Sequence, residues 1–190
     1  MKKVRIFVIS GPGGAGKTTI VDKLFAKDKI KKTCIKGITV TTRPIRSKEK
    51  EGKDYFFVDE EEFLRLKEKR FFLESQKVLD NYYGTPRLLH LLAKTKKKGL
   101  VLVLDVKGGM YLKKNSEVGK IITIFLAAPS EKELCQRMKK RAESKKVITQ
   151  RVELAKKELQ YSKYYDYVVT NKTVEKTLQE LQNIILENIK

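Results

Sequence analysis

The chain has 190 residues, a length that suits one domain with a sizeable core. Hydrophobic residues make up 41% of it and charged residues 35%, which indicates a globular protein and excludes a disordered one. No apolar run reaches the length of about 18 residues that a membrane-spanning helix needs, so we expect no membrane partner.

Basic residues outnumber acidic residues by 43 to 23, which gives a formal net charge of +20. A field of this sign attracts polyanions such as nucleotides, nucleic acids and anionic surfaces. The lysines are spread along the whole chain and are not interleaved with aromatic residues in one stripe. We therefore expect no dedicated nucleic-acid partner, and steeply salt-dependent RNA binding would support the alternative.

The first apolar run, residues 4–9, leads directly into a glycine-rich segment, so we interpret it as a strand and not as an export signal. Two cysteines, Cys34 and Cys135, are too few for a disulfide framework. Reduced cysteines are typical of the cytoplasm, and the sequence therefore predicts a cytoplasmic location.

The glycine-rich segment matches the pattern G-x-x-x-x-G-K-T at residues 11–18, between that predicted strand and an amphipathic stretch. Its glycines allow several backbone N–H groups to converge on one phosphate chain at a helix N-terminus. Lys17 would reach the β- and γ-phosphates, and Thr18 would offer its hydroxyl to Mg²⁺. The predicted phosphate-binding loop consists of Gly11, Pro12, Gly13, Gly14, Ala15, Gly16, Lys17, Thr18 and Thr19.

A rival pattern lies on the same residues, because Gly11, Gly13 and Gly16 also spell the dinucleotide fingerprint G-x-G-x-x-G. That fingerprint needs an acidic residue about 20 positions later, and residues 33–38 contain none. The Lys-Thr pair that follows Gly16 is also not needed by a dinucleotide fold. The phosphate-binding loop is therefore the favoured interpretation.

Further apolar runs predict strands at residues 4–10, 36–41, 100–106, 121–128 and 167–170. Amphipathic segments predict helices at residues 17–27, 59–69, 86–97, 107–114, 130–141, 148–161 and 174–189. Ser130 followed by Glu133 forms a capping box at the start of one of them. Continuous apolar runs with helices between them indicate an α/β fold with a parallel sheet covered on both faces.

Two segments interrupt this alternation. Residues 38–80 contain a Lys/Glu-rich stretch and a strand signal at residues 54–58, which predicts an insertion with its own short sheet over the mouth of the loop. Residues 137–151 are polar and basic, and they join two predicted helices.

Charged side chains suited to phosphate chemistry follow these elements. Asp105 ends a buried apolar strand, as a Walker B aspartate near Mg²⁺ does. Arg43 and Arg46, close in sequence to a tyrosine, are suited to grip one phosphate through charge-assisted hydrogen bonds. Arg137 and Arg141 are four residues apart and so share one side of a helix.

The order and spacing of several motifs resemble the guanylate kinase family over nearly the whole chain. These motifs are Thr39-x-Thr41-Thr42-Arg43-x-x-Arg46, Gly52-Lys53-Asp54-Tyr55-x-Phe57-Val58, Phe72-Leu73-Glu74, Asn81-Tyr82-Tyr83-Gly84-Thr85, Asp105-Val106-x-Gly108 and Pro129-Ser130. The resemblance implies a three-layer P-loop kinase fold with a core of residues 1–37, 90–136 and 152–190. It also implies a GMP-binding insertion at about residues 38–89 and a helical lid at about residues 137–151.

The same resemblance implies transfer of the γ-phosphoryl group of ATP to GMP, with dGMP accepted as well and Mg²⁺ as the cofactor. ATP would bind the loop of residues 11–19, and Thr18 and Asp105 would hold Mg²⁺, partly through water. The residues implied for GMP binding are Thr39, Arg43, Arg46, Tyr55, Glu74, Tyr83, Gly84, Thr85 and Asp105. The catalytic cations would be Lys17, Arg43 and the lid residues Arg137, Arg141 and Arg151.

A physical argument supports the role of Glu74. The guanine edge presents two adjacent donors, N1–H and the 2-amino group, and one carboxylate can accept both. Adenine has an unprotonated N1 at that position and would leave the carboxylate unpaired.

The sequence departs from the family pattern beside Asp105. Val103 stands where the family has an Asp, and Lys107 stands where it has a Gln. Two alternatives remain open: a related kinase of a phosphorylated sugar, and a non-catalytic binding module with the same fold. The sequence is compatible with a monomer or a homodimer.

Overall fold

The structure is a computed structural model that describes residues 3–47, 49–115, 118–139 and 145–189. Its main element is a parallel sheet, which in the described residues has five strands in the order β2-β7-β1-β8-β9. Their bounds are Arg5–Ser10 for β1, Cys34–Lys36 for β2, Gly99–Val103 for β7, Lys120–Ala127 for β8 and Tyr167–Thr170 for β9. The predicted α/β class and parallel sheet are confirmed.

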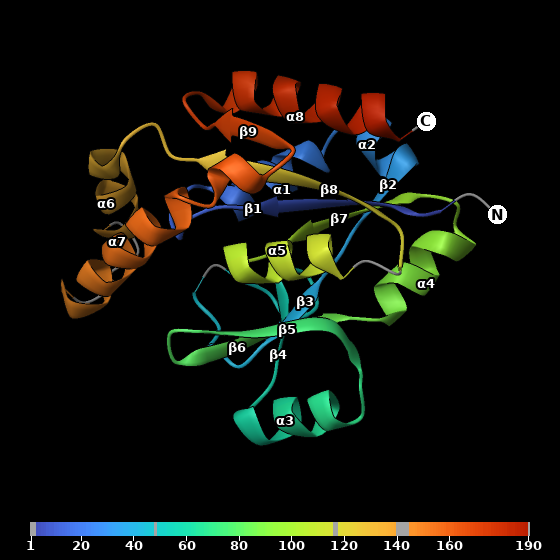
Figure 1. Cartoon of the computed structure of the whole chain (residues 1–190), viewed down its shortest axis with the longest axis horizontal. Helices are drawn as coiled ribbons and strands as arrows, with labels where there is room; N and C mark the ends of the chain where they lie inside the picture. Colours follow the sequence, from blue (N-terminus) through green and yellow to red (C-terminus); the bar gives the residue numbers. More distant parts are fainter. Residues whose placement is uncertain (1–2, 48, 116–117, 140–144, 190) are drawn as a thin grey trace.

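Helices cover both faces of this sheet, as Figure 1 shows. Those of the core are α1 (Lys17–Leu24), α2 (Asp28–Thr33), α4 (Leu88–Thr95), α5 (Val106–Lys114) and α8 (Val174–Asn188). Successive residues of a strand point to opposite faces. On β1, Phe7 and Ile9 therefore pack with buried residues of α1 and α8, whereas Ile6 and Val8 pack with residues of α4 and α5. The result is a three-layer core.

A second, smaller sheet lies below the core in Figure 1. Among the described residues its order is β4-β3-β6-β5, with β3 and β4 parallel and the other pairs antiparallel. Its strands are β3 (Thr39–Thr41), β4 (Tyr55–Phe57), β5 (Phe72–Val78) and β6 (Asn81–Pro86). Helix α3 (Glu60–Glu68) begins at Asp59, whose side chain accepts a hydrogen bond from the backbone N–H of Glu62, and its Phe63 packs on the small sheet.

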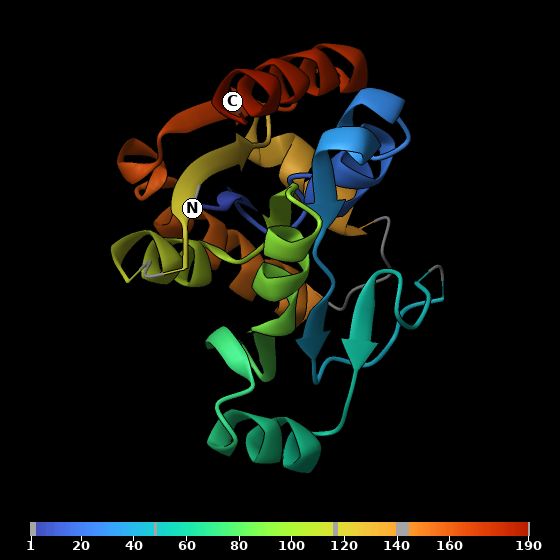
Figure 2. The same cartoon turned by 90° about the vertical axis from the view of Figure 1, so that its right-hand side faces the viewer.

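The predicted strand at residues 36–41 is wrong. The chain forms two strands there, β2 in the main sheet and β3 in the small sheet, and it passes between them through Gly37 and Ile38. A Cβ atom on Gly37 would clash with the side chain of Leu102, so a larger residue in this connection would force the leucine side chains around it to move. Figure 2 shows the chain leaving the core at this point.

Other elements also differ from the predictions, and the strand expected at residues 100–106 ends at Val103. The helix expected at residues 17–27 ends at Leu24, and α2 follows as a separate short helix. The hairpin of β5 and β6 was not predicted. The helix expected at residues 148–161 is α7 (Lys145–Leu159), which begins three residues earlier.

Helix α6 (Glu131–Lys139) lies beside α7 at one side of the core in Figure 1. Ser130 caps α6, because its hydroxyl accepts a hydrogen bond from the backbone N–H of Glu133 at 3.2 Å. Leu134 of α6 packs against Ala155 of α7 in a small cluster of its own. These two helices therefore pack together at one side of the core, and α7 borders the cavity described below.

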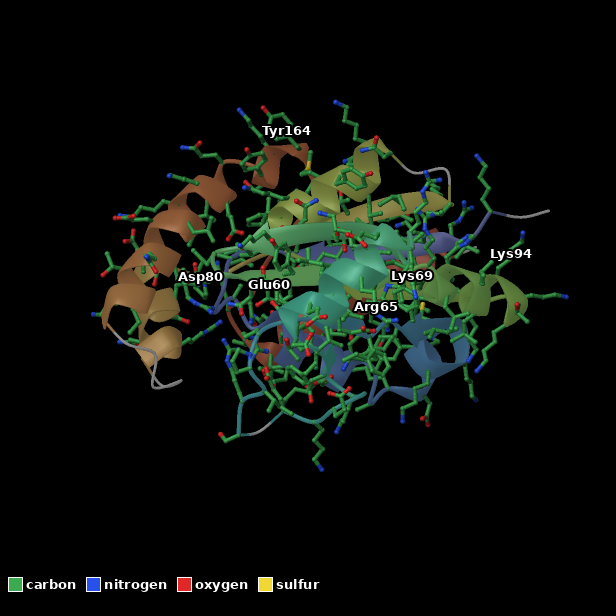
Figure 3. The ribbon with its side chains drawn as sticks, turned by 90° about the horizontal axis from the view of Figure 1, so that it is seen from below. Glu60, Arg65, Lys69, Asp80, Lys94 and Tyr164 are labelled. Atoms are coloured by element: carbon green, nitrogen blue, oxygen red, sulfur yellow. The ribbon has the colours of Figure 1, made fainter. Side chains whose placement is uncertain are left out.

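The basic side chains on the face seen in Figure 3 come from separate elements, with Arg65 and Lys69 at α3 and Lys94 on α4. Acidic side chains lie among them, and Glu62 accepts two hydrogen bonds from Arg65. Within the ranges that the structure describes, no helix combines the length and the apolar character needed to cross a bilayer.

Candidate active site

The loop between β1 and α1 depends on glycine at several positions. Gly11, Gly14 and Gly16 have φ values of 142°, 88° and 94°, which side-chain-bearing residues rarely adopt. A Cβ atom on Gly11 would lie 2.2 Å from the carbonyl oxygen of Leu126, and one on Gly16 would lie 2.7 Å from Nδ2 of Asn171. The loop therefore fits tightly against the carboxyl edge of the main sheet, where α1 begins at Lys17.

Lys17 folds back over this loop. Its Nζ atom donates hydrogen bonds to the carbonyl oxygens of Gly11 at 2.6 Å and Pro12 at 3.0 Å. The ammonium group is thereby held against the loop at the N-terminus of α1, and in P-loop proteins a lysine and a helix N-terminus of this kind bind a phosphate chain.

Two side chains from the last third of the chain support the loop from outside. Asn171, which follows β9, donates from Nδ2 to the carbonyl oxygen of Ala15 at 2.8 Å. Arg137 of α6 donates to the same oxygen at 3.3 Å, and it is paired with Glu133 at 2.9 Å. Asn171 was not predicted from the sequence. The signal that could have revealed Asn171 is its place directly after a predicted parallel strand. The carboxyl ends of parallel strands meet at one edge of the sheet, where ligands bind.

A cavity of about 770 Å³ extends from this loop to the small sheet. Most of the residues predicted for the site line it: Gly11, Gly13, Gly14, Gly16, Lys17, Thr18, Thr19, Thr39, Arg43, Arg46, Tyr55, Glu74, Tyr83, Gly84, Asp105 and Arg151. The main sheet, the small sheet and α7 thus contribute to one cavity.

Four predicted residues that the structure describes do not line the cavity walls. Pro12 and Ala15 are buried in the loop itself, and Thr85 is buried behind Glu74. Arg137 lies on the outer side of the loop, on the carbonyl oxygen of Ala15, instead of facing the cavity. Arg141 lies outside the described residues.

A buried carboxylate forms one wall of the cavity. Glu74 of β5 is 4% exposed, and its Oε1 atom accepts a hydrogen bond from the Thr85 hydroxyl of β6 at 2.6 Å. Burial raises the pKa of Glu74 to about 7; hydrogen bonds from Thr85 oppose the rise, and the nearby charge of Asp105 adds to it. A Cβ atom on Gly108 would lie 2.8 Å from Oε2 of Glu74, so α5 closes tightly over this carboxylate.

Asp105 begins α5 and faces the same cavity. Its Oδ1 atom accepts a hydrogen bond from the backbone N–H of Gly108 at 3.0 Å, so it is the N-cap of the helix. Burial raises the pKa of Asp105, whereas backbone hydrogen bonds and the positive charge of Lys17 lower it. The carboxylate that caps α5 is therefore also within the electrostatic influence of the loop lysine.

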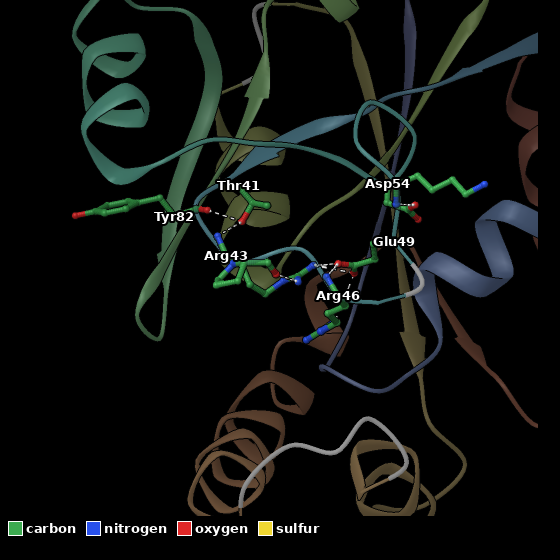
Figure 4. A network of polar contacts seen from close by, with 8 residues as sticks. Thr41, Arg43, Arg46, Glu49, Asp54 and Tyr82 are labelled. Atoms are coloured by element: carbon green, nitrogen blue, oxygen red, sulfur yellow. Dashed lines mark hydrogen bonds and ion pairs between the residues drawn. The ribbon is translucent and has the colours of Figure 1, made fainter.

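A cluster of cations and aromatic rings lines the cavity at the small sheet. The guanidinium of Arg43 lies 5.4 Å from the ring centre of Tyr55, and the rings of Tyr55 and Tyr83 are 6.1 Å apart, edge to face. Arg46 lies near Arg43, and both contact Glu49, as Figure 4 shows. Glu49 was not predicted from the sequence, because it belongs to a charged stretch in which no pattern distinguishes it.

Helix α7 places Arg151 and Glu158 on the cavity wall. Burial raises the pKa of Glu158 to about 7, and the positive charge of Lys17 opposes this rise. Glu158 was also missed. Its spacing of seven residues from Arg151, which is about two helical turns, was the signal that could have revealed it.

We expect Glu74→Gln to stabilise the protein at pH 8. The pKa of Glu74 is raised on folding, so the burial cost of its charge is absent below about pH 4.5 and is fully present above about pH 7. The amide keeps an acceptor for Thr85 and carries no charge. The free energy of unfolding should therefore rise by up to about 3 kcal/mol at pH 8 and change little at pH 5. Thermal denaturation of both proteins at the two pH values measures this, and an equal difference at both would contradict it.

The fold and this cavity define a class of protein. A loop with the G-x-x-x-x-G-K-T pattern lies at the carboxyl edge of a parallel sheet, and it shares its cavity with a second sheet and two arginines that follow β3. This arrangement is typical of P-loop kinases that act on small phosphorylated substrates.

Comparison with known proteins identifies the family within this class. The family model described as guanylate kinase matches residues 3–188. A guanylate kinase of Caldanaerobacter subterraneus subsp. tengcongensis is 41% identical over 186 residues, which cover 97% of this chain and 88% of that protein. A guanylate kinase of Mycoplasma genitalium is 41% identical over 184 residues, covering 96% and 75%. The crystal structure of guanylate kinase from Anaplasma phagocytophilum superposes with a TM-score of 0.81 at 33% identity, covering 100% of this chain and 88% of that one. The chain belongs to the guanylate kinase family.

Proposed function

We propose that the cavity binds ATP at the loop of residues 11–19 and GMP at the small sheet, and that the γ-phosphoryl group of ATP passes directly to the phosphate of GMP. The observation that carries this proposal is the presence, in one cavity, of the Lys17 loop and the buried Glu74 carboxylate. The loop suits a phosphate chain, and the carboxylate suits the two donors of a guanine edge. Family membership supports the same reaction.

The acceptor is held at two ends. Arg43, Arg46, Tyr55 and Tyr83, which we call the phosphate clamp, bind the GMP phosphate. Glu74 accepts from guanine N1–H and the 2-amino group. Thr39, Gly84, Thr85 and Asp105 complete the walls around the base. In this assignment residues 38–89 form the GMP-binding part, and the other described residues form the core and the lid.

Positioning and charge neutralisation account for the chemistry. An oxygen of the GMP phosphate is already a competent nucleophile, so the transfer needs no general base. Lys17 stabilises negative charge on the β- and γ-phosphates in the transition state. Arg151 faces the cavity from α7 and contributes a further positive charge. Arg137 is proposed to reach the phosphates when the lid of residues 137–151 closes, and Arg141 of the same segment is assigned this role by sequence alone.

The donor atoms near the loop fit a hard cation. The hydroxyl of Thr18 and the carboxylate of Asp105 both face the cavity, and oxygen atoms of this kind are preferred by Mg²⁺. In the described ranges no group of three or more His, Cys, Asp or Glu side chains could hold a metal alone, which suits an ion bound mainly by phosphates and water. When bound, Mg²⁺ would neutralise charge on the phosphate oxygens.

An assay across acceptors tests the function. We expect ADP release from ATP with GMP and dGMP, and kcat/KM values lower by roughly a hundredfold or more with AMP, CMP, UMP and ribose phosphates. A preference for a ribose phosphate would favour a sugar-phosphate kinase instead. Failure to bind ATP, measured by calorimetry, would favour a non-catalytic binding module.

We also propose a cytoplasmic location for the protein. Cys34 and Cys135 are both free, and burial raises the pKa of Cys34 to about 11, which keeps its thiol protonated and unreactive. Free cysteines are typical of a reducing compartment.

A further inference from the structure

Glu49 contacts both arginines of the phosphate clamp, and the proposed reaction gives it no role. Its two carboxylate oxygens accept hydrogen bonds from Nη2 of Arg43 at 2.8 and 2.9 Å. Nη1 of Arg46 lies 3.7 Å from Oε1 of the same carboxylate. Figure 4 shows this carboxylate between the two arginines. One acidic side chain therefore contacts two cations that lie three residues apart in the segment after β3.

Arg43 has little freedom in this arrangement. Its side chain is only 9% exposed, and Nη1 donates to the carbonyl oxygen of Pro44 at 2.6 Å. The rings of Tyr55 and Phe57 lie 5.4 and 5.7 Å from its guanidinium carbon. Burial by itself would lower the pKa of Arg43, but hydrogen bonding to Glu49 and the charge of Glu49 raise it above the ordinary value. Without Glu49, a largely buried guanidinium would lose its main counter-charge.

A carboxylate beside two arginines could also act as a plug, occupying the place of the substrate phosphate until the substrate displaces it. The backbone contacts of Glu49 argue against this. Its Oε2 atom accepts from the backbone N–H of Arg46 at 3.0 Å, and its own backbone N–H donates to the carbonyl oxygen of Arg46 at 2.9 Å. Displacing the carboxylate would therefore open the turn that carries Arg46.

We propose that Glu49 is a positioning residue that holds Arg43 and Arg46 in the geometry required by the acceptor phosphate. This inference rests on the proposed function, because it assigns the two arginines to the GMP phosphate. The cluster of two arginines and one glutamate keeps one net positive charge for that phosphate. Pre-organised donors bind an anion more tightly than donors that must first be ordered.

Calorimetry with two ligands tests the proposal without relying on turnover. GMP and guanosine share the base and the ribose, and only GMP carries the phosphate. In Glu49→Gln, we expect GMP affinity to fall by roughly tenfold or more and guanosine affinity to change by less than about twofold. A general loss of structure would weaken both ligands equally. Wild-type phosphorylation of GMP, measured separately, tests the proposed function and not this inference.

Glu51→Gln is the matched control. Glu51 belongs to the same loop, and its carboxylate accepts from the backbone N–H of Phe57 at 3.1 Å. This variant should keep the wild-type ratio of GMP to guanosine affinity. If Glu49→Gln does not fold, Glu49→Asp keeps the charge but withdraws the carboxylate by one methylene, and it should lower the same ratio by roughly threefold or more. An unchanged ratio in the folded variant, or tighter GMP binding as expected of a plug, would overturn the proposal.

Discussion

Lys17→Met is expected to lower the turnover of ATP and GMP by at least roughly a thousandfold, which is about 4 kcal/mol of transition-state stabilisation. The Lys17 ammonium is held over the loop by the carbonyl oxygens of Gly11 and Pro12, at 2.6 and 3.0 Å. Methionine has a similar length but carries no charge. The fold should survive, because Asn171 still holds the loop through the Ala15 carbonyl oxygen at 2.8 Å.

Steady-state kinetics with saturating ATP and GMP measure this effect, together with a melting curve. Lys23→Met is the control, because Lys23 lies in the same helix, is exposed and does not line the cavity. It removes the same charge and should leave turnover within about twofold of wild type. Near-normal turnover in Lys17→Met would contradict the role of the loop as the ATP site.

The second large effect is expected from Glu74→Gln, which should reduce kcat/KM for GMP by roughly a hundredfold or more. A carboxylate offers acceptors to both guanine donors, whereas an amide presents an N–H group to one of them. Thr85 already occupies part of the hydrogen-bonding capacity of Oε1 at 2.6 Å, so the side chain has little freedom to adjust. Activity with AMP should fall much less, and the ratio of GMP to AMP activity should therefore decrease.

Glu74→Gln is expected to raise stability and to lower activity, so the two measurements distinguish a lost contact with guanine from unfolding. The variant should be more stable than wild type at pH 8 and yet far less active with GMP, so unfolding could not explain the loss. Glu180→Gln, at an exposed position on α8, is the control for both measurements. Unchanged GMP activity in Glu74→Gln would contradict the assignment of this carboxylate to guanine.

The local parts of the site could be predicted from the sequence because their geometry is fixed within a few residues. The loop from Gly11 to Thr18 requires glycine at positions of positive φ and places Lys17 at the start of a helix. The capping box at Ser130 and the last strand at residues 167–170 depend on local patterns in the same way. The resemblance of the chain to a known family supplied the remaining residues of the cavity.

The elements that were not predicted depend on contacts distant in sequence. In β5, Glu74 occupies a buried position where the alternation of a strand would place an apolar residue. The apolar pattern that predicts a strand is therefore interrupted at the site. Residues 36–41 divide between two sheets because β2 pairs with β7 and β3 pairs with β4 and β6, which are all distant in sequence. Arg137 likewise has a distant partner, because it donates to the carbonyl oxygen of Ala15 as well as to Glu133 of its own helix, and it does not line the cavity.

The departure from the family pattern beside Asp105 also has a structural consequence. Val103 lines the cavity at the position where the family has an Asp, so an apolar side chain replaces a carboxylate there. Asp105 and Glu158 are carboxylates on the cavity wall that interact with the charge of Lys17, and Glu74 on the same wall interacts with the charge of Asp105. With Val103 in this place, Asp105 has no carboxylate two residues before it to share its proposed contacts with the base and the metal.

The central claim is that one cavity transfers a phosphoryl group from ATP to GMP. Incubation of the protein with Mg²⁺, GMP and ATP radiolabelled at its γ-phosphate, followed by separation of the products, tests it directly. We predict that the label appears in GDP, at a rate that matches the formation of ADP. Label found only in inorganic phosphate, or only in ATP, would contradict the account.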